Sequence, residues 1–454
     1  MGGGASKKAA RPAAAAAKEP EPAAPHVVED EASVRWRELD GDRLDRLLEG
    51  KGEVDSAEER RTRPVRLVRA SYIIGLYQRG EKIPTRKEIA EEEGAFLSLD
   101  ELKQAALTTA RAGQAGRDIL PILAVSYPWL HKDNPDPKGY HLSQLGPALE
   151  RLLAGRDGWD VSFGVFVDWM CLYQNAPSSR DQAEDELFGT ALGDMDVWYG
   201  HKNTTVLSLT ALPERYPEGY YDAGAAGISN VATYHSRGWC RFEWVVAGMI
   251  KDKDRRLDLG FFDPVVHSHR QKMINACRQS REPPIAPNAF DRIVRGDKPL
   301  AFTKGNQDAE HVIKLHSQAF GRFFRQADKL RFSSCGWGDA EAEQLSQTLN
   351  CGYILQRLVE LQLDDNEIGD SGARAISAAL RDGGDEHGAA PELETVYLHS
   401  NRISDAGARS IVEALRDAKQ WSPKLERLKL DGNPASDAAK AEVLAALASR
   451  KLPA

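Results

Sequence analysis

The chain has 454 residues, which is too many for one compact core and predicts two or three domains. Its formal net charge is -8, with 60 basic residues interspersed among 68 acidic ones, which argues against nucleic acid as a main partner. No apolar run reaches the roughly 18 to 20 residues that a membrane-spanning helix needs. The five cysteines are widely spaced and include no CxxC pair, a pattern that predicts reduced thiols in a cytoplasmic protein and no zinc site.

Residues 1–33 are rich in Ala, Pro, Lys and Glu and contain almost nothing large and apolar, so they predict a disordered tail. The opening MGGGAS fits the acceptor pattern for N-myristoylation of Gly2, with Ser6 in place and Lys7 and Lys8 following. One acyl chain binds membranes only weakly, so the pattern predicts reversible membrane attachment. A Gly/Ala-rich tail also produces this pattern by chance.

Residues 34–117 are heavily charged, with apolar residues at helical spacing, and predict a helical lead-in. In residues 118–266, short β-rich runs alternate with helical ones, which predicts a doubly wound parallel sheet covered on both faces. The predicted strands are ILPILAVSY (119–127), FGVFVDW (163–169), NTTVLSLT (203–210) and LDLGFF (257–262). In such a sheet, ligands bind at the carboxyl ends of the strands. Residues 267–326, which include the Pro-rich REPPIAPNAF, are interpreted as a connector.

The last segment, residues 327–454, repeats itself. LVELQLDDNEIGDSGARAISAAL (358–380) shares a template with segments 393–415 and 425–447, and a degenerate copy covers 329–349. The degenerate copy has Cys335 where the others have Asn. The LxxLxL run predicts a short strand whose leucines point inward. The Asn side chain is expected to bond backbone groups at the turn, and GARxIxxAL predicts a helix on the convex side. The pattern resembles the ribonuclease-inhibitor type of leucine-rich repeat and predicts an α/β solenoid. One end of this short stack is expected to lean on the upstream domain.

The strand face of these repeats is the predicted surface for a protein partner. Its outward positions include Gln362, Tyr397, His399 and Lys429, and Tyr397 is the expected anchor because aromatic residues concentrate interface energy. The alternative is a solvated strand face that carries an ordinary tyrosine.

Four blocks in the middle domain carry a family resemblance. SYPW (126–129), VDWMCLYQ (167–174), DMDVWY (194–199) and SRGWCRFE (236–243) follow one another in the order of the fungal heterokaryon-incompatibility (HET) domain. The chain departs from that pattern because no Gly follows SYPW and because Phe242 stands where the family usually has Gln.

The same blocks resemble a Toll/interleukin-1 receptor (TIR) domain, in which a strand is followed by YxxSxWCLxEL. Tyr234, Trp239 and Glu243 match that spacing. The resemblance implies that Glu243 is the catalytic carboxylate of an NAD glycohydrolase, with NAD as substrate and no resident cofactor or metal. It also implies homo-oligomerisation through this domain.

Further site residues follow from these blocks and from the predicted strand ends. Asp168 is a candidate crevice carboxylate beside Glu243, although it could equally cap the following turn. Ser126, Trp129 and Trp239 are the residues expected to contact NAD.

Other chemistry-bearing residues have simpler interpretations. Cys171 has no recognisable His partner and is expected to be a small buried hydrophobe. His267 and His269 on one strand chelate poorly, and the oxygen-rich segment 131–141 does not follow a calcium-loop pattern. The chain also lacks a Walker-type GxxxxGK[ST] motif.

These predictions describe an α/β protein in which a TIR/HET-like domain precedes leucine-rich repeats. The expected function is an intracellular sensor in defence or stress signalling, in which the repeats bind a protein and the α/β domain signals by cleaving NAD. The alternative is a non-enzymatic scaffold in which both parts only bind protein.

Overall fold

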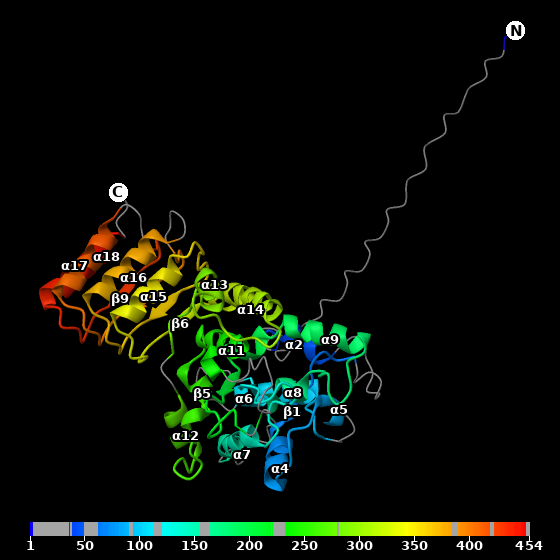
Figure 1. The fold of residues 1–454 in the computed structure, drawn as a ribbon. Helices are drawn as coiled ribbons and strands as arrows, with labels where there is room; N and C mark the ends of the chain where they lie inside the picture. The colour runs from blue at the N-terminus through cyan, green and yellow to red at the C-terminus, as the bar shows by residue number, and fades with distance from the viewer. Residues whose placement is uncertain are drawn as a thin grey trace.

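The computed structural model describes residues 1–2, 36, 39–49, 62–89, 94–111, 120–154, 163–218, 220, 232–278, 281–383, 389–417 and 422–450. Figure 1 shows a sheet surrounded by helices, followed by a stack of strand–helix units that ends at the C-terminus. The predicted disordered tail lies outside the described residues except for Met1 and Gly2, which are exposed. None of the helices in the described part is long and apolar enough to cross a membrane.

The first sheet has five strands in the order β1-β3-β2-β4-β5. These strands are β1 (Val68–Arg69), β2 (Ile122–Ser126), β3 (Gly164–Phe166), β4 (Thr205–Ser208) and β5 (Arg256–Asp258). The last four run parallel, and β1 pairs antiparallel with β3 at the edge. Every residue of β2 is buried, because helices cover both faces of a parallel sheet. Each of the four segments predicted as strands between residues 118 and 266 contains one of these strands, but the segment 257–262 is a strand only to Asp258 and continues as a 3-10 turn (Leu259–Phe261).

The helices that surround this sheet include those expected from the apolar spacing. They are α2 (Gly41–Leu48), α4 (Ala70–Arg79), α5 (Arg86–Ile89), α6 (Leu99–Arg111), α7 (Tyr140–Leu153), α8 (Asp168–Cys171), α9 (Gln182–Gly193), α10 (Asp196–Gly200) and α11 (Gly238–Gly248), with single turns η2 (Tyr234–Ser236), η3 (Lys253–Arg255) and η4 (Leu259–Phe261). Helix α4 packs on α7, and α10 packs on α11. The segment predicted as a helical lead-in thus supplies helices, but it also supplies strand β1, which is too short to show a period of two.

Residues 267–326 form more of the core than a connector would. They contain α12 (Arg270–Cys277), α13 (Pro287–Arg295), α14 (Asn306–Ala319) and the π-helical turn η5 (Phe320–Phe324). Phe290 of α13 is fully buried, and its ring stacks on that of His316 at 4.0 Å between centroids. Helix α14 packs against α10 and α11. These contacts attach the segment firmly to the α/β sheet.

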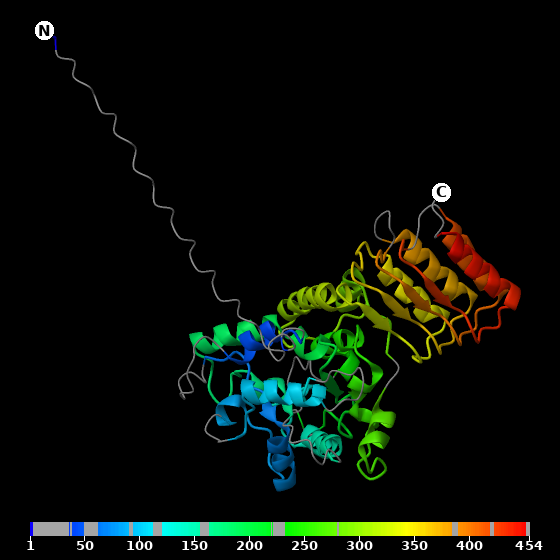
Figure 2. The same ribbon diagram turned by 180° about the vertical axis from the view of Figure 1, so that it is seen from behind.

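The repeats form a second, parallel sheet in sequence order. Its strands are β6 (Lys329–Arg331), β7 (Glu360–Gln362), β8 (Thr395–Tyr397) and β9 (Arg427–Lys429), and its helices are α15 (Asp339–Leu349), α16 (Asp370–Asp382), α17 (Asp405–Arg416) and α18 (Asp437–Ser449). Figure 2 shows the strands side by side on one face and the helices on the other. Each helix packs on the next, so the units share one core.

The asparagines bond the turns as the repeat pattern predicts. Asn366 Oδ1 accepts the backbone N–H groups of Cys335 and Trp337, and Nδ2 donates to the carbonyls of Phe332 and Leu363. Asn401 and Asn433 form the corresponding donor bonds one and two units later, and the Oδ1 of each accepts one backbone N–H, from Ile368 and Ile403 respectively. The first unit has Cys335 at this position, and its backbone N–H is bonded by the asparagine of the next unit.

The first repeat packs against the upstream part of the chain, as expected for a short stack of repeats. Trp337 Nε1 donates to the carbonyl of Arg281 at 2.6 Å, and Thr348 Oγ1 donates to that of Pro284 at 2.6 Å. Most of the buried apolar residues of both parts belong to one continuous cluster. The two sheets are therefore joined through a shared hydrophobic core.

Candidate functional site

The carboxyl ends of β2, β3 and β4 meet at one edge of the first sheet. Ser126 is the last residue of β2 and pairs in register with Ser208, the last residue of β4. Asp168 follows β3 at the start of α8, and Glu243 lies on α11, which packs against β2. The structure thus brings together Ser126, Asp168 and Glu243, which the sequence placed at strand ends and in motif blocks.

Glu243 lies in a chain of hydrogen-bonded side chains. Ser126 Oγ donates to Glu243 Oε2 at 2.5 Å, and the hydroxyl of Tyr234 lies 2.5 Å from the same Oγ. Because the Ser126 O–H is directed at Glu243 Oε2, the Ser126 oxygen accepts the second bond and Tyr234 donates it. All three side chains are buried. The pair Tyr234–Ser126 therefore fixes the position of the carboxyl group.

Burial raises the pKa of Glu243 to about 8. The hydrogen bond from Ser126 opposes this rise, and the nearby charge of Asp168 adds to it. At neutral pH most of the molecules therefore carry Glu243 in its protonated form. A group with a pKa near the working pH can act in proton transfer or charge stabilisation.

Asp168 accepts three hydrogen bonds. They come from the Tyr127 hydroxyl at 2.5 Å, the Trp129 indole at 3.1 Å and the backbone N–H of Trp169 at 2.7 Å. Burial raises the pKa of Asp168, and these donors oppose that rise. The carboxyl group thus anchors the SYPW loop and bonds the backbone N–H of Trp169 in the turn after β3. Its role as a crevice carboxylate remains a prediction.

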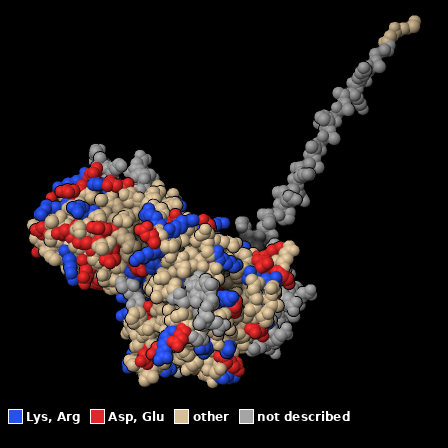
Figure 3. Space-filling model, viewed as in Figure 1, with Lys and Arg blue, Asp and Glu red and all other residues tan. Residues whose placement is uncertain are grey.

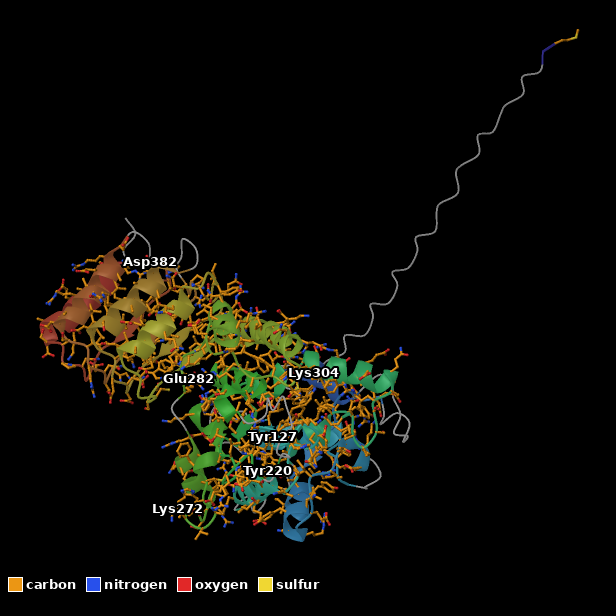
Figure 4. All side chains as sticks on the ribbon, in the orientation of Figure 1. Tyr127, Tyr220, Lys272, Glu282, Lys304 and Asp382 are labelled. Carbon is orange, nitrogen blue, oxygen red and sulfur yellow. The ribbon has the colours of Figure 1, made fainter. Side chains whose placement is uncertain are left out.

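The sequence did not single out Tyr127, and it marked Tyr234 only as a residue of the TIR-like block, without a role in the site. Tyr127 bonds Asp168, while its neighbour Ser126 bonds Glu243, so successive residues serve the two carboxyl groups. Figure 4 shows Tyr127 within the α/β part. Their positions in the sequence could have pointed to them, because Tyr127 follows Ser126 at the end of a predicted strand and Tyr234 belongs to the TIR-like block.

Arg237, from the SRGWCRFE block, holds the loop from the other side. Its Nη1 donates to the carbonyl of Trp129, its Nε donates to that of Ala232 at 2.8 Å, and its Nη2 donates to the Tyr216 hydroxyl at 3.3 Å. The arginine thus connects the segment before α11 with the SYPW loop. No role for Arg237 was predicted from the sequence.

Trp239 stands one helical turn before Glu243 on α11. Its ring lies 6.2 Å from that of Phe242 and 5.9 Å from that of His311 on α14, between centroids. Trp129 lies elsewhere in the site. Its indole N–H donates to Asp168, and its ring lies 5.3 Å from the Trp169 ring between centroids. A role for Trp239 in binding NAD remains a prediction.

Cys171 is a buried structural residue. Its thiol donates to the carbonyl of Val165 at 3.3 Å and accepts the N–H of Val167 at 3.3 Å. Burial raises the pKa of this thiol to about 12. A thiol that remains protonated at neutral pH is a poor nucleophile.

His267 and His269 each bond the backbone nearby. His267 Nδ1 accepts the N–H of Asp263 at 2.9 Å, and His269 accepts that of Lys272 at the start of α12. Among the described residues, no group of three or more His, Cys, Asp or Glu side chains is placed to hold a metal ion.

The four residues expected to bind a protein partner lie close together on the strand face of the repeats. Gln362, Tyr397 and Lys429 are in register on β7, β8 and β9. Lys429 Nζ lies 5.0 Å from the centre of the Tyr397 ring, and the ring of His399 lies 6.1 Å from that ring. His399 in turn lies 3.8 Å from the carboxylate of Asp364. Beside them, β9 and α18 border a cavity of about 270 Å³ that Lys429 helps to line.

Comparison with known protein families bears on this second part. A family model described as Leucine Rich repeat matches residues 356–377, which contain β7 and the first half of α16. This unit is a leucine-rich repeat. The three other units share its template and stack on one another in the same sheet, so the prediction of repeats is confirmed at this level. No curated protein matches the chain.

Proposed function

We propose that the leucine-rich repeats bind a protein partner through the face formed by β6, β7, β8 and β9. The observation that carries this proposal is the row of Gln362, Tyr397 and Lys429, with His399 beside it. The half-buried Tyr397 ring contacts a cation and an imidazole and is thereby held in place. A preorganised aromatic side chain loses little entropy on binding and is a frequent anchor at interfaces.

The test compares two double variants of the full chain. Once a partner is identified by chemical cross-linking, its affinity is measured for Tyr397→Ala/His399→Ala and for Arg409→Ala/Glu413→Ala, which changes exposed residues of α17 on the opposite face. We expect the first pair to weaken binding at least tenfold and the second to leave it unchanged. Equal affinities for both variants would exclude the strand face as the site.

We infer a second function for the α/β part, cleavage of the bond between nicotinamide and ribose in NAD. The strand order β3-β2-β4-β5 is that of a doubly wound sheet, in which ligands bind beside the carboxyl ends of the strands. Glu243 and Asp168 lie at that edge. The support is the position of Glu243 there, together with the resemblance of its sequence block to TIR and HET domains.

The chemistry requires one well-placed carboxylate. Water attacks C1′ of the ribose, the C–N bond breaks, and the products are nicotinamide, ADP-ribose and a proton. Positive charge develops on the ribose in the transition state, and an ionised Glu243 would stabilise it. Ser126 and Tyr234 would hold the carboxylate, while Asp168 would hold the SYPW loop.

Nicotinamide release is measured for concentrated wild type, for Glu243→Gln and for Glu282→Gln. Glu282 is a matched control because it is a surface carboxylate that pairs with Arg241 of α11 at 2.6 Å. We expect activity only in wild type and the control, increasing with pH through about 8 as Glu243 ionises. No activity in folded wild type, or full activity in Glu243→Gln, would leave the α/β part as a binding scaffold.

Together the two proposals describe a sensor. The repeats would recognise a protein, and the α/β part would respond by cleaving NAD, with self-association of that part as a further element of the proposal. Sedimentation of the full chain with and without partner tests the self-association.

A further inference from the structure

A cavity of about 800 Å³ lies where the α/β part meets the first repeat. Its walls come from α2, from the turn before β4, from the residues around η5 and β6, and from Arg357 before β7. Helices α2 and α14 lie near one another in both ribbon views (Figures 1 and 2). This volume falls in the range of small-molecule sites, about 300 to 1,000 Å³.

The lining is strongly basic. Of the eighteen described residues that line the cavity, eight are Arg or Lys and four are Asp. The whole chain is acidic, and Figure 3 shows mainly Asp and Glu on the visible face of the repeats, with Lys and Arg gathered near the junction. A local excess of cations in an acidic protein favours an anionic ligand.

Two arginines of the wall are held in place by buried carboxylates. Arg43 donates to Asp196, which is fully buried, and to Asp194 at 2.7 Å. Arg322 lies 3.1 Å from Asp196. Arg43 Nη1 also forms an ion pair with Asp40 at 3.6 Å, so this guanidinium is fixed by three carboxylates. The side chain of Arg322 remains 42% exposed, so its guanidinium can still contact an anionic oxygen.

Three further cations of the lining are exposed and form no ion pair with another described residue. They are Arg46 on α2, Lys202 in the turn before β4, and Arg357 before β7. Other basic residues of the wall are already paired, as Lys329 is with Glu360 at 3.1 Å and Arg331 is with Asp252 at 3.7 Å. The unpaired cations come from separate elements, so one ligand with several charged groups could contact them together.

We propose that this cavity binds a small soluble polyanion that carries two or more phosphate groups. Arginine suits this ligand because its planar guanidinium can bond two phosphate oxygens at once. The site is distinct from that of Glu243. Lys202 lies before the amino end of β4, whereas the Glu243 site lies at the carboxyl ends of the strands, where β4 ends at Ser208. The inference therefore does not rest on NAD cleavage.

A ligand in this position has a structural consequence. It would contact α2 and the β4 turn of the α/β part and also Arg357 of the repeats. By mass action, any ligand that binds only the folded chain raises its stability. The polyanion would thus strengthen the attachment between the two parts.

The test is calorimetric titration of the full chain with sodium tripolyphosphate, with orthophosphate as the weaker probe. The variant Lys202→Gln/Arg357→Gln is compared with Lys298→Gln/Arg409→Gln, which removes the same two residue types at exposed positions that do not line the cavity. We expect at least tenfold weaker binding only in the first variant, and weaker binding by wild type in high salt. Thermal melting checks that both variants fold.

Two outcomes would overturn the proposal. One is the absence of binding to wild type at millimolar tripolyphosphate. The other is an equal affinity of the two double variants, which would indicate nonspecific attraction. A third arm uses vesicles that contain phosphatidylinositol bisphosphate, and binding to these without binding to tripolyphosphate would contradict a soluble ligand.

Discussion

Glu243 is a carboxyl group from which water is largely excluded, and its side-chain partners are the hydroxyls of Ser126 and Tyr199, not cations. These hydroxyls can orient the charged form but cannot neutralise it. The proton therefore stays on the acid to unusually high pH. Asp168 differs because three donors converge on it, which favours its ionised form despite burial. The site thus holds two acids in different environments.

The ionisation of Glu243 should be visible in stability. Its pKa is about 8 in the folded chain and 4.5 ordinarily, so the folded state binds the proton more tightly. This contribution to stability is full below pH about 4.5 and is lost as the pH rises through about 8. Glu243→Gln cannot ionise. Between pH 5 and pH 9 its free energy of unfolding should decrease by roughly 2–4 kcal/mol less than that of wild type.

Urea unfolding at the two pH values measures this difference. Glu413→Gln, at an exposed position on α17, is the control and should show the wild-type decrease. Equal decreases in all three proteins would mean that Glu243 titrates normally and is accessible to water.

Cys171 gives a second prediction at this scale. Because it is fully buried and its pKa is raised to about 12, it should resist iodoacetamide in the native protein at pH 8 and react fully after unfolding in urea. The half-buried Cys351 should react before it. Peptide mass mapping over time measures both rates, and rapid native labelling of Cys171 would contradict the buried arrangement.

The sequence indicated the positions of Asp168 and Glu243 better than those of the residues that bond or surround them. Asp168 and Glu243 could be placed because one follows a strand and the other ends a recognisable block. Tyr127 and Arg237 stand in the same blocks, but their roles depend on which segments meet in space. A single sequence does not specify that Arg237 reaches the carbonyl of Trp129.

At the scale of elements, an aspartate at the start of one repeat helix bonds the start of the next helix, a contact that the repeat pattern did not predict. Asp370 at the start of α16 accepts the N–H groups of Ser404 and Gly407 in the next unit, and the Ser404 hydroxyl as well. Asp339 does the same for the unit that follows it. Each aspartate therefore caps the helix of its neighbour. These N–H groups would otherwise lack partners, since the first turn of a helix leaves its donors unpaired.

Loss of one such cap should destabilise the stack. In Asp370→Ala, three hydrogen bonds to the next unit disappear, with an expected cost of about 1–3 kcal/mol. Asp437→Ala is the matched control, because Asp437 occupies the same place at the start of α18 but accepts no hydrogen bond from another unit among the described residues. Both variants lose the favourable charge at a helix N-terminus, so the difference between them isolates the cap.

The free energy of unfolding of the two variants is compared in urea. The interpretation fails if Asp437→Ala is as damaging as Asp370→Ala, because the effect would then come from the charge alone.

The sequence predicted those helices and strands whose own residues show a regular spacing of apolar and polar positions. The leucine and asparagine spacing predicted β7, β8 and β9 and their turns, because each unit repeats the same local constraints. Strand β1 has two residues and shows no alternation, so its place beside β3 depends on the sheet that it joins. Helices α13 and α14 were missed because their Pro-rich flank resembles a linker, whereas the burial of Phe290 follows from packing.

At the scale of the molecule, a series of contacts connects the two sheets. Lys251, after α11, donates to the Thr204 hydroxyl before β4 at 2.6 Å. Arg281 donates to the carbonyl of Lys251, and its guanidinium lies 4.5 Å from the centre of the Phe332 ring in the first repeat. Glu282, labelled near the junction in Figure 4, pairs with Arg241 of α11. With a shared core as well, the two parts should unfold together.

Trp337 is the residue through which this cooperativity can be tested. It is buried, its ring stacks on Phe332 at 4.7 Å, and its indole N–H donates to the carbonyl of Arg281. Trp337→Phe keeps an aromatic ring but leaves that buried carbonyl without its donor, which should cost about 1–3 kcal/mol. Since the parts share a core, hydrogen exchange should accelerate equally for amides of β2 and of β8.

Tyr397→Phe, on the exposed face of β8, is the control and should change stability by less than about 0.5 kcal/mol. Faster exchange confined to β8 would show that the repeats unfold alone and that the junction is only a contact between independent domains.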